Sequence, residues 1–265
     1  MGRVLSGKII AINDRATFLW PNDIGNSLPM TQPIALPENP VILALDTCTE
    51  ACSAALYAKG VTYADMADAP REHSQRLLPM IDGLLNDAGL SISDVNIIAY
   101  GRGPGSFTGI RICTSMTQGL ALGRELPVIG ISTLAAMAQE AMEKSGETRV
   151  LCAIDARMAE VYVGEYRMHD GVATLVGEEA VLPPAMVKVS DGVRLACGTG
   201  FDAYPELLTL GHGLELSTEV KFPAAEAMLT LAKQGIAQGL HTSVDDLAPV
   251  YLRDTVAWKK LPGRE

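Results

Sequence analysis

VILALDTCTEACSAALY, residues 41–57, places two short apolar runs on either side of a polar turn. VILAL (41–45) has the length and composition of a buried β-strand, and SAALY (53–57) has those of a second strand. Asp46 ends the first run, and DTCTE (46–50) forms the turn. The pattern therefore predicts a β-hairpin with an aspartate at the end of its first strand.

The same design recurs in the second half of the chain. VLCAI (150–154) leads into Asp155, a turn and VYVGEY (161–166). Each hairpin is followed by a further strand and a glycine-containing loop, NIIAYGRG (96–103) in the first half and VRLACGTG (193–200) in the second. Short apolar runs can match by chance, but two matched features in the same order favour an internal duplication.

The duplication predicts two lobes, residues 41–147 and 148–265, each of ordinary domain size. Residues 1–40 differ, because prolines interrupt any regular element there: Pro21, Pro29, Pro33, Pro37 and Pro40. Two interpretations are open, an extension that docks on the body or a poorly ordered appendage with Met30 as the true start. The lack of a folding pattern favours the second.

The composition is that of an acidic globular chain. Of 265 residues, 48% are hydrophobic and 20% charged, and the formal net charge is -10. An acidic chain repels nucleic-acid phosphates, so RNA contact would need a partner that supplies positive charge. We see no secretion signal and no apolar run long enough to span a membrane, and the five cysteines suit reduced, buried thiols. These features predict a cytoplasmic protein without membrane contact.

Helical periodicity predicts helices at residues 74–89, 110–123, 132–146 and 223–239, with a helix-like segment at 201–208. Ser74 could cap the first helix, and Pro79 would kink it or delay its start. The first two helices are apolar over a wide arc, which is either buried in the chain's own core or docked on a partner. The candidate partner-binding residues are Leu77, Leu78, Ile81, Leu84, Leu85, Met116, Gly119 and Leu120.

GRGPGSFTGIR (101–111) joins a predicted strand to a predicted helix. Its glycines permit close backbone approach, and a hydroxyl in the loop could cap the helix, whose N-terminus favours an anion. The candidate anion-binding residues are Gly103, Gly105, Ser106 and Thr108. A tight strand-to-helix crossover without any ligand explains the same residues equally well.

Two lobes that each open with a strand, an aspartate and a hairpin resemble the actin, heat-shock ATPase and sugar-kinase superfamily. The resemblance implies an α/β fold with two ribonuclease-H-like lobes. In the active ATPases of that superfamily, glycines in the hairpin let the backbone approach the nucleotide phosphates. DTCTE (46–50) has no glycine and places Glu50 where an anion would lie, so it is a poor phosphate cradle. Asp46 is explained at least as well by capping the turn as by catalysis.

Longer motifs resemble the bacterial TsaB (YeaZ) family, from about Val41 to the C-terminus. They are ILALDTCTEACSAALY (42–57), REHSQRLLP (71–79), GRGPGSFTGIR (101–111), AIDARMAEVY (153–162) and PVYLRDTVAWKK (249–260). The motifs occur in the family's order, and no single motif carries the resemblance. Residues 1–40 lie outside it.

The resemblance implies a non-catalytic subunit that works with a TsaD-type paralogue and a TsaE-type ATPase. A separate enzyme makes threonylcarbamoyl-AMP, and the complex transfers the threonylcarbamoyl group to the adenosine next to the anticodon in tRNAs reading codons that begin with A. The TsaD-type subunit holds the active site and a metal, bound by a histidine pair. The resemblance further implies pairing through a helical bundle in the first lobe, tRNA contact only through the complex, and a homodimer as one state of the isolated chain. No cofactor is expected on the chain alone, and a nucleotide could bind only within the complex.

The histidine spacing agrees with a non-catalytic role. No two of the four histidines stand at the i, i+4 spacing of a helical metal site: His73, His169, His212 and His241. Neither catalytic nor metal-binding residues are therefore predicted, and His73 is expected at the surface or as a cap.

Asp155, Arg157 and Glu160 are expected to form structural ion pairs around the second hairpin, with a role in a site as the second interpretation. Two rival functions stay open for the whole chain. One is an autonomous ATPase or kinase, which the glycine-free turn disfavours. The other is a metallopeptidase, which the missing histidine pair disfavours.

Overall fold

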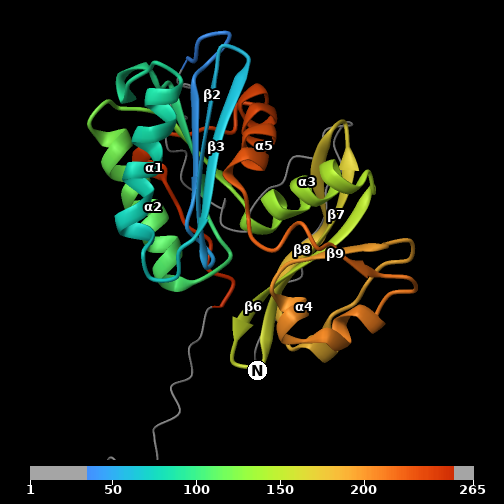
Figure 1. Ribbon diagram of the computed structural model, residues 1–265. Coiled ribbons are helices and arrows are strands. Elements are labelled where there is room, and N and C mark those ends of the chain that lie inside the picture. The colour runs from blue at the N-terminus through green and yellow to red at the C-terminus, as the bar shows by residue number, and fades with distance from the viewer. Residues whose placement is uncertain (1–34, 254–265) are drawn as a thin grey trace, which may run out of the picture. The chain divides into compact units, whose positions relative to one another are not determined.

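Two five-stranded sheets organise the residues that the computed structural model describes, 35–253 (Figure 1). The first sheet contains β1 (Ile42–Asp46), β2 (Ala51–Ala58), β3 (Val61–Asp68), β4 (Ile97–Gly101) and β5 (Val128–Ile131). The second contains β6 (Arg149–Arg157), β7 (Glu160–His169), β8 (Val172–Leu182), β9 (Leu195–Cys197) and β10 (Glu215–Leu216). The predictions for residues 1–34 and 254–265 lie outside the described residues.

The two sheets repeat one topology. The first has the order β3-β2-β1-β4-β5, and the second, read in the same direction, has the order β8-β7-β6-β9-β10. In each, the first strand pairs antiparallel with the hairpin strand and parallel with the later strand, β1 with β2 and β4, and β6 with β7 and β9. The strands that contain Leu45 and Ile154 therefore lie in different sheets, as a duplication requires. The fold class is the predicted one, α/β with two ribonuclease-H-like lobes.

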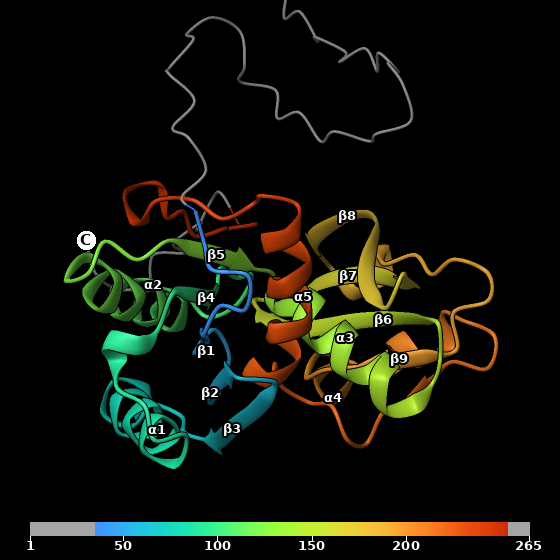
Figure 2. The same cartoon turned by 90° about the horizontal axis from the view of Figure 1, so that it is seen from above.

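The helices cover the sheets on distinct faces (Figures 1 and 2). They are α1 (His73–Asp87), α2 (Phe107–Leu122), α3 (Thr133–Ser145), α4 (Gly200–Ala203) and α5 (Ala225–Ala237), with short 3-10 helices η1 (Ile92–Asp94), η2 (Pro184–Met186), η3 (Pro205–Thr209) and η4 (Val244–Asp246). Helices α1 and α2 bury one face of the first sheet, and α5 buries the other. Helices α3 and α5 contact each other, and α3 also packs on the second sheet.

Cap residues explain where the helices begin and end. The Ser132 hydroxyl accepts a hydrogen bond from the Ala135 N–H at the start of α3, and Gly146, with φ of 76°, ends it as predicted. Helix α2 begins at Phe107, earlier than predicted, because Ser106 caps it by accepting from the Gly109 N–H. The Ser and Gly signals therefore set these boundaries more closely than the apolar period does.

The first predicted helix and the helix-like segment also differ from the structure. Ser74 is not the cap of α1, because the helix begins one residue earlier, at His73, with Glu72 in the cap position. Pro79 lies inside α1 without ending it. The carbonyl that Pro79 leaves without an intrahelical donor belongs to the exposed Gln75, where water can replace it. The helix-like segment 201–208 is split, because α4 ends before Pro205.

The C-terminal part of the chain returns to the first sheet. The Ser53 hydroxyl on β2 donates to the Pro223 carbonyl and accepts from the Ala225 N–H, which fixes the start of α5. Met228 and Leu229 of α5 are buried against this sheet. The lobe limits 41–147 and 148–265 stay a prediction, but α5 packs on the sheet of the preceding lobe.

All five cysteines are free and buried, as predicted. Within residues 35–253, no helix has the length and apolarity needed to cross a membrane.

Candidate functional site: the cleft between the hairpin turns

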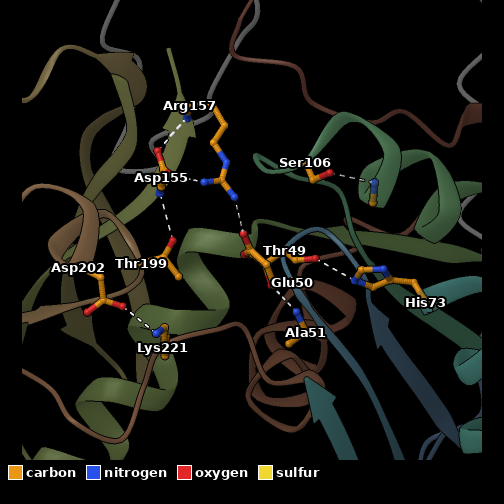
Figure 3. Close-up of polar contacts among 11 residues, drawn as sticks. Thr49, Glu50, Ala51, His73, Ser106, Asp155, Arg157, Thr199, Asp202 and Lys221 are labelled. Carbon is orange, nitrogen blue, oxygen red and sulfur yellow. Dashed lines mark hydrogen bonds and ion pairs between the residues drawn. The ribbon is translucent and has the colours of Figure 1, made fainter. Parts of the chain in front are cut away.

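The turns of the two duplicated hairpins line one cleft of about 770 Å³ (Figure 3). The β1–β2 turn contributes residues 48–50. The β6–β7 turn, taken together with the last residues of β6, contributes residues 155–158. The start of α1, the loop before α2 and residues 250–253 also line the cleft. The cleft is thus the place where the turns of both duplicated hairpins come together.

Asp46 is enclosed by the protein beside this cleft. Its Oδ1 accepts the Cys48 N–H at 2.8 Å, which closes the turn. A Cβ at Gly101 would lie 1.8 Å from Oδ2, so only a glycine fits over the carboxyl group. Burial raises the pKa of Asp46 to about 7, and hydrogen bonds from Cys48 offset only part of that rise. This geometry supports the turn-capping interpretation of Asp46.

The glycine-rich loop packs directly on the β1–β2 turn. The Ser106 N–H donates to the Cys48 carbonyl at 2.7 Å, and the Thr47 hydroxyl donates to the Gly109 carbonyl at 2.8 Å. A Cβ at Gly105 would meet the Cys48 carbonyl oxygen at 2.2 Å, and one at Gly109 would meet the Thr47 carbonyl oxygen at 2.1 Å. The loop glycines thus permit a close crossover of two backbones.

Two of the candidate anion-binding residues, Gly105 and Ser106, line the cleft, while Gly103 is buried and Thr108 is exposed in the first turn of α2. The Gly103 carbonyl is used by the Thr133 N–H. Anion binding by this loop stays a prediction, and the crossover interpretation accounts for the contacts seen.

Arg157 joins the two hairpin turns across the cleft (Figure 3). Its guanidinium lies 3.1 Å from Glu50 of the first turn and 2.9 Å from Asp155 of its own turn. Asp155 also accepts the Arg157 N–H, and its own N–H donates to the Thr199 hydroxyl. Asp155 and Arg157 are therefore ion-paired as predicted, whereas Glu160 pairs with Arg253.

His73 corrects a sequence expectation. It is buried, not on the surface, and its Nε2 lies 2.9 Å from the Thr49 carbonyl oxygen (Figure 3). The reason is that α1 begins against the β1–β2 turn. No local signal could have revealed this contact, because the partner is 24 residues away in the sequence.

Three cleft residues were missed by the sequence patterns. Arg253 donates to the carbonyls of Ala156 and Arg157 in the β6–β7 turn. The rings of Phe107 and Tyr251 lie 5.7 Å apart at the cleft wall. All three lie within the quoted family motifs, Phe107 in residues 101–111 and Tyr251 and Arg253 in residues 249–260, but no pattern gave any of them a role.

The apolar arc of α1 is mostly core. Leu77, Ile81, Leu84 and Leu85 are 5% exposed or less and pack between α1 and the first sheet. The prediction that these four contact a partner is corrected, because the chain's own sheet already covers them. The other four candidates are accessible: Leu78 is 41% exposed, Gly119 has no atom within 4 Å of an added Cβ, and Met116 and Leu120 are half-buried.

Comparison with known proteins adds relatives that span the described fold. A family model described as "TsaD: tRNA N6-adenosine threonylcarbamoyltransferase" matches residues 67–261. The tRNA threonylcarbamoyladenosine biosynthesis protein TsaB of Escherichia coli strain K12 is 52% identical over 84% of this chain and 99% of its own. The protein of the same name from Haemophilus influenzae is 41% identical over 86% of this chain and 100% of its own. Among solved structures, YeaZ from Pseudomonas aeruginosa is 44% identical, with a TM-score of 0.76 over 80% of this chain and 100% of that chain.

Proposed function

Because the chain belongs to the TsaB (YeaZ) family, we propose that it is a subunit of the machinery that makes threonylcarbamoyladenosine in tRNA. It acts as the non-catalytic partner of a TsaD-type paralogue, together with a TsaE-type ATPase. The complex transfers the threonylcarbamoyl group from threonylcarbamoyl-AMP to the adenosine next to the anticodon in tRNAs reading codons that begin with A. In this proposal the reaction takes place on the paralogue, in the cytoplasm.

The positions of two carboxylates at the cleft support the proposed non-catalytic role. The Asp46 carboxyl is enclosed under Gly101 instead of lining the cleft. Glu50 brings a second carboxylate to the turn, where it pairs with Arg157. A carboxylate at this position repels the phosphates that the active ATPases of the superfamily bind there. The chain is therefore better suited to supporting a partner than to turning over a nucleotide alone.

Four accessible residues of α1 and α2 form the proposed docking face, defined as Leu78, Met116, Gly119 and Leu120. Helices α1 and α2 lie on the same side of the first sheet. The exposed Leu78 and the half-buried Met116 and Leu120 supply apolar area, and the open space above Gly119 lets a partner helix approach closely. An acidic chain of net charge -10 would leave tRNA contact mainly to the partner.

Leu78→Glu tests the docking face against a core position of the same helix. Leu78→Glu should keep the fold and lose binding to the TsaD-type partner, because an unpaired charge in a dry interface costs several kcal/mol, roughly a hundredfold or more in affinity. Ile81→Glu, at 1% exposure, should instead unfold the chain. Circular dichroism and size-exclusion chromatography separate the two outcomes, and reconstituted tRNA modification should fall with pairing.

Thr62→Glu adds the same charge at an exposed position on β3, outside both helices, and serves as the matched control. It should pair and support modification like the wild type. A folded Leu78→Glu variant that still pairs would remove Leu78 from the interface. A wild-type chain that binds no TsaD-type subunit at all would overturn the proposed function itself.

A further inference from the structure

Residues 248–253, here called the strap, connect the two sheets across the cleft. At its first end, the Ala248 N–H donates to the Tyr100 hydroxyl and the Val250 N–H donates to the Arg102 carbonyl at 2.7 Å, both at the end of β4. At its last described residue, Arg253 reaches the β6–β7 turn of the second sheet. The strap therefore ties the second hairpin to the first lobe.

Arg253 binds two backbone carbonyls and a carboxylate of the second hairpin. Its guanidinium donates to the Ala156 carbonyl at 3.0 Å and to the Arg157 carbonyl at 3.3 Å, and it pairs with Glu160. Its side chain is only 16% exposed. Charge-assisted bonds that are largely shielded from water hold geometry better than exposed ion pairs do.

The turn that Arg253 holds has a backbone that would not persist without support. Arg157, Met158 and Ala159 have φ values of 61°, 56° and 59°, a left-handed run of three residues that all carry a Cβ. L-residues avoid this region, and such a run persists only where the surroundings determine it. Arg253 supplies that support, because it binds two carbonyls at the start of the run.

The β6–β7 turn directs Arg157 toward the first lobe. Arg157 is 74% exposed, so its 3.1 Å pair with Glu50 would be weak if the side chain were free to move. The left-handed backbone and the two contacts with Asp155 restrict Arg157 before it meets Glu50. The strength of the Glu50 contact therefore depends on the turn, and through it on Arg253.

Glu50 and its neighbours in the β1–β2 turn contact the starts of both helices that carry the docking face. The Glu50 carbonyl accepts the Ala69 N–H at 3.1 Å, just before α1. The Thr49 carbonyl contacts His73, the first residue of α1, and the Cys48 carbonyl accepts the Ser106 N–H at the cap of α2. A displacement of the β1–β2 turn would therefore move the starts of α1 and α2.

We propose that Arg253 is a positioning residue for partner binding. It acts through Arg157 and Glu50 to hold the β1–β2 turn, and thereby the start of the helices that carry the docking face. The second lobe, which contributes none of the docking-face residues, would in this way set the affinity for the partner. This inference rests on the proposed function for the identity of the partner.

The test is a double-mutant cycle on the full chain, with the purified TsaD-type subunit as the probe. Arg253→Ala and Glu50→Gln should each raise the dissociation constant roughly three- to tenfold. The double variant should raise the dissociation constant little further, because both changes interrupt the same series of contacts. Arg253→Lys should not restore wild-type affinity, because an ammonium lacks the planar fork that binds two carbonyls. If Arg253→Ala does not fold, Arg253→Lys takes its place in the cycle.

Arg149→Ala is the matched control, because Arg149 also donates to a backbone carbonyl, that of Asp191, but makes no contact with the turn. Its affinity for the partner should equal that of the wild type. The inference would be overturned if the two increases in the dissociation constant multiplied in the double variant. It would also be overturned if Arg253→Ala and Glu50→Gln folded and kept the wild-type affinity.

A second measurement needs no partner and so separates this inference from the proposed function. Hydrogen–deuterium exchange of the isolated chain should accelerate at Ala69 and at the first turn of α1 in both variants, and stay unchanged in Arg149→Ala. Unchanged exchange in Arg253→Ala would refute the coupling even if the partner were a different protein.

Discussion

Asp46 shows how one enclosed residue links the fold to pH. Its pKa is raised from 3.8 to about 7 by burial. Between these values the folded chain binds more protons than the unfolded chain, so stability falls as pH rises. The stabilisation from Asp46 is fully present below the pKa of the unfolded chain and is lost as the pH rises through the pKa of the folded chain. Above that pKa, stability no longer depends on the ionisation of Asp46.

Asp46→Asn should remove this pH dependence while keeping the acceptor for the Cys48 N–H. We expect the wild type to lose roughly 2–4 kcal/mol of stability between pH 4 and pH 8 relative to the variant. Urea unfolding of both proteins across this range measures the difference and cancels the other titrating groups. Parallel stability curves would show that folding leaves the pKa of Asp46 unchanged.

At the scale of the element, α2 contains two glycines with opposite requirements. A Cβ at Gly109 would collide with the Thr47 carbonyl oxygen at 2.1 Å, whereas a Cβ at Gly119 would enter open space. Gly109→Ala should therefore cost about 1–3 kcal/mol, because the turn and the helix cannot both keep their positions. Gly119→Ala should stabilise the isolated chain by about 0.5–1 kcal/mol, because alanine is the better helix former.

The same Gly119→Ala change should weaken partner binding, because the methyl group enters the space left for a close helix approach. Measured on one preparation, the variant would then show a higher melting temperature together with a larger dissociation constant for the partner. If binding stayed at the wild-type level, Gly119 would lie outside the interface, although the rest of the docking face could remain.

For the whole molecule, the two ends of the chain should respond differently to truncation. Residues 1–29 lie outside the motifs that resemble the family and show no amphipathic period, so deleting residues 2–29 should leave the melting temperature unchanged within a few degrees. Removing the chain from Ala248 onward should lower it, because the bonds of Val250 and Arg253 are lost. A large decrease after the N-terminal deletion would show that this segment packs on the core.

Local patterns determined the elements of this protein and their repetition. Apolar runs ending in Asp46 and Asp155 marked both hairpins, because strand length and turn chemistry act over a few residues. Ser132 and Gly146 marked the ends of α3 for the same reason. The exposed edge strand β3 (Val61–Asp68) was not predicted, because its two faces are both largely exposed and show no apolar alternation.

Only the tertiary structure decided which groups meet. The period of α1 predicts an apolar arc, but only the position of the first sheet separates the buried Ile81 from the accessible Leu78. Likewise, Arg253 contacts the β6–β7 turn from 97 residues away at Ala156, and His73 contacts the turn that precedes its helix. The physical reason is that period and capping are properties of neighbouring residues, whereas contacts between distant residues depend on the path of the chain, which no local pattern records.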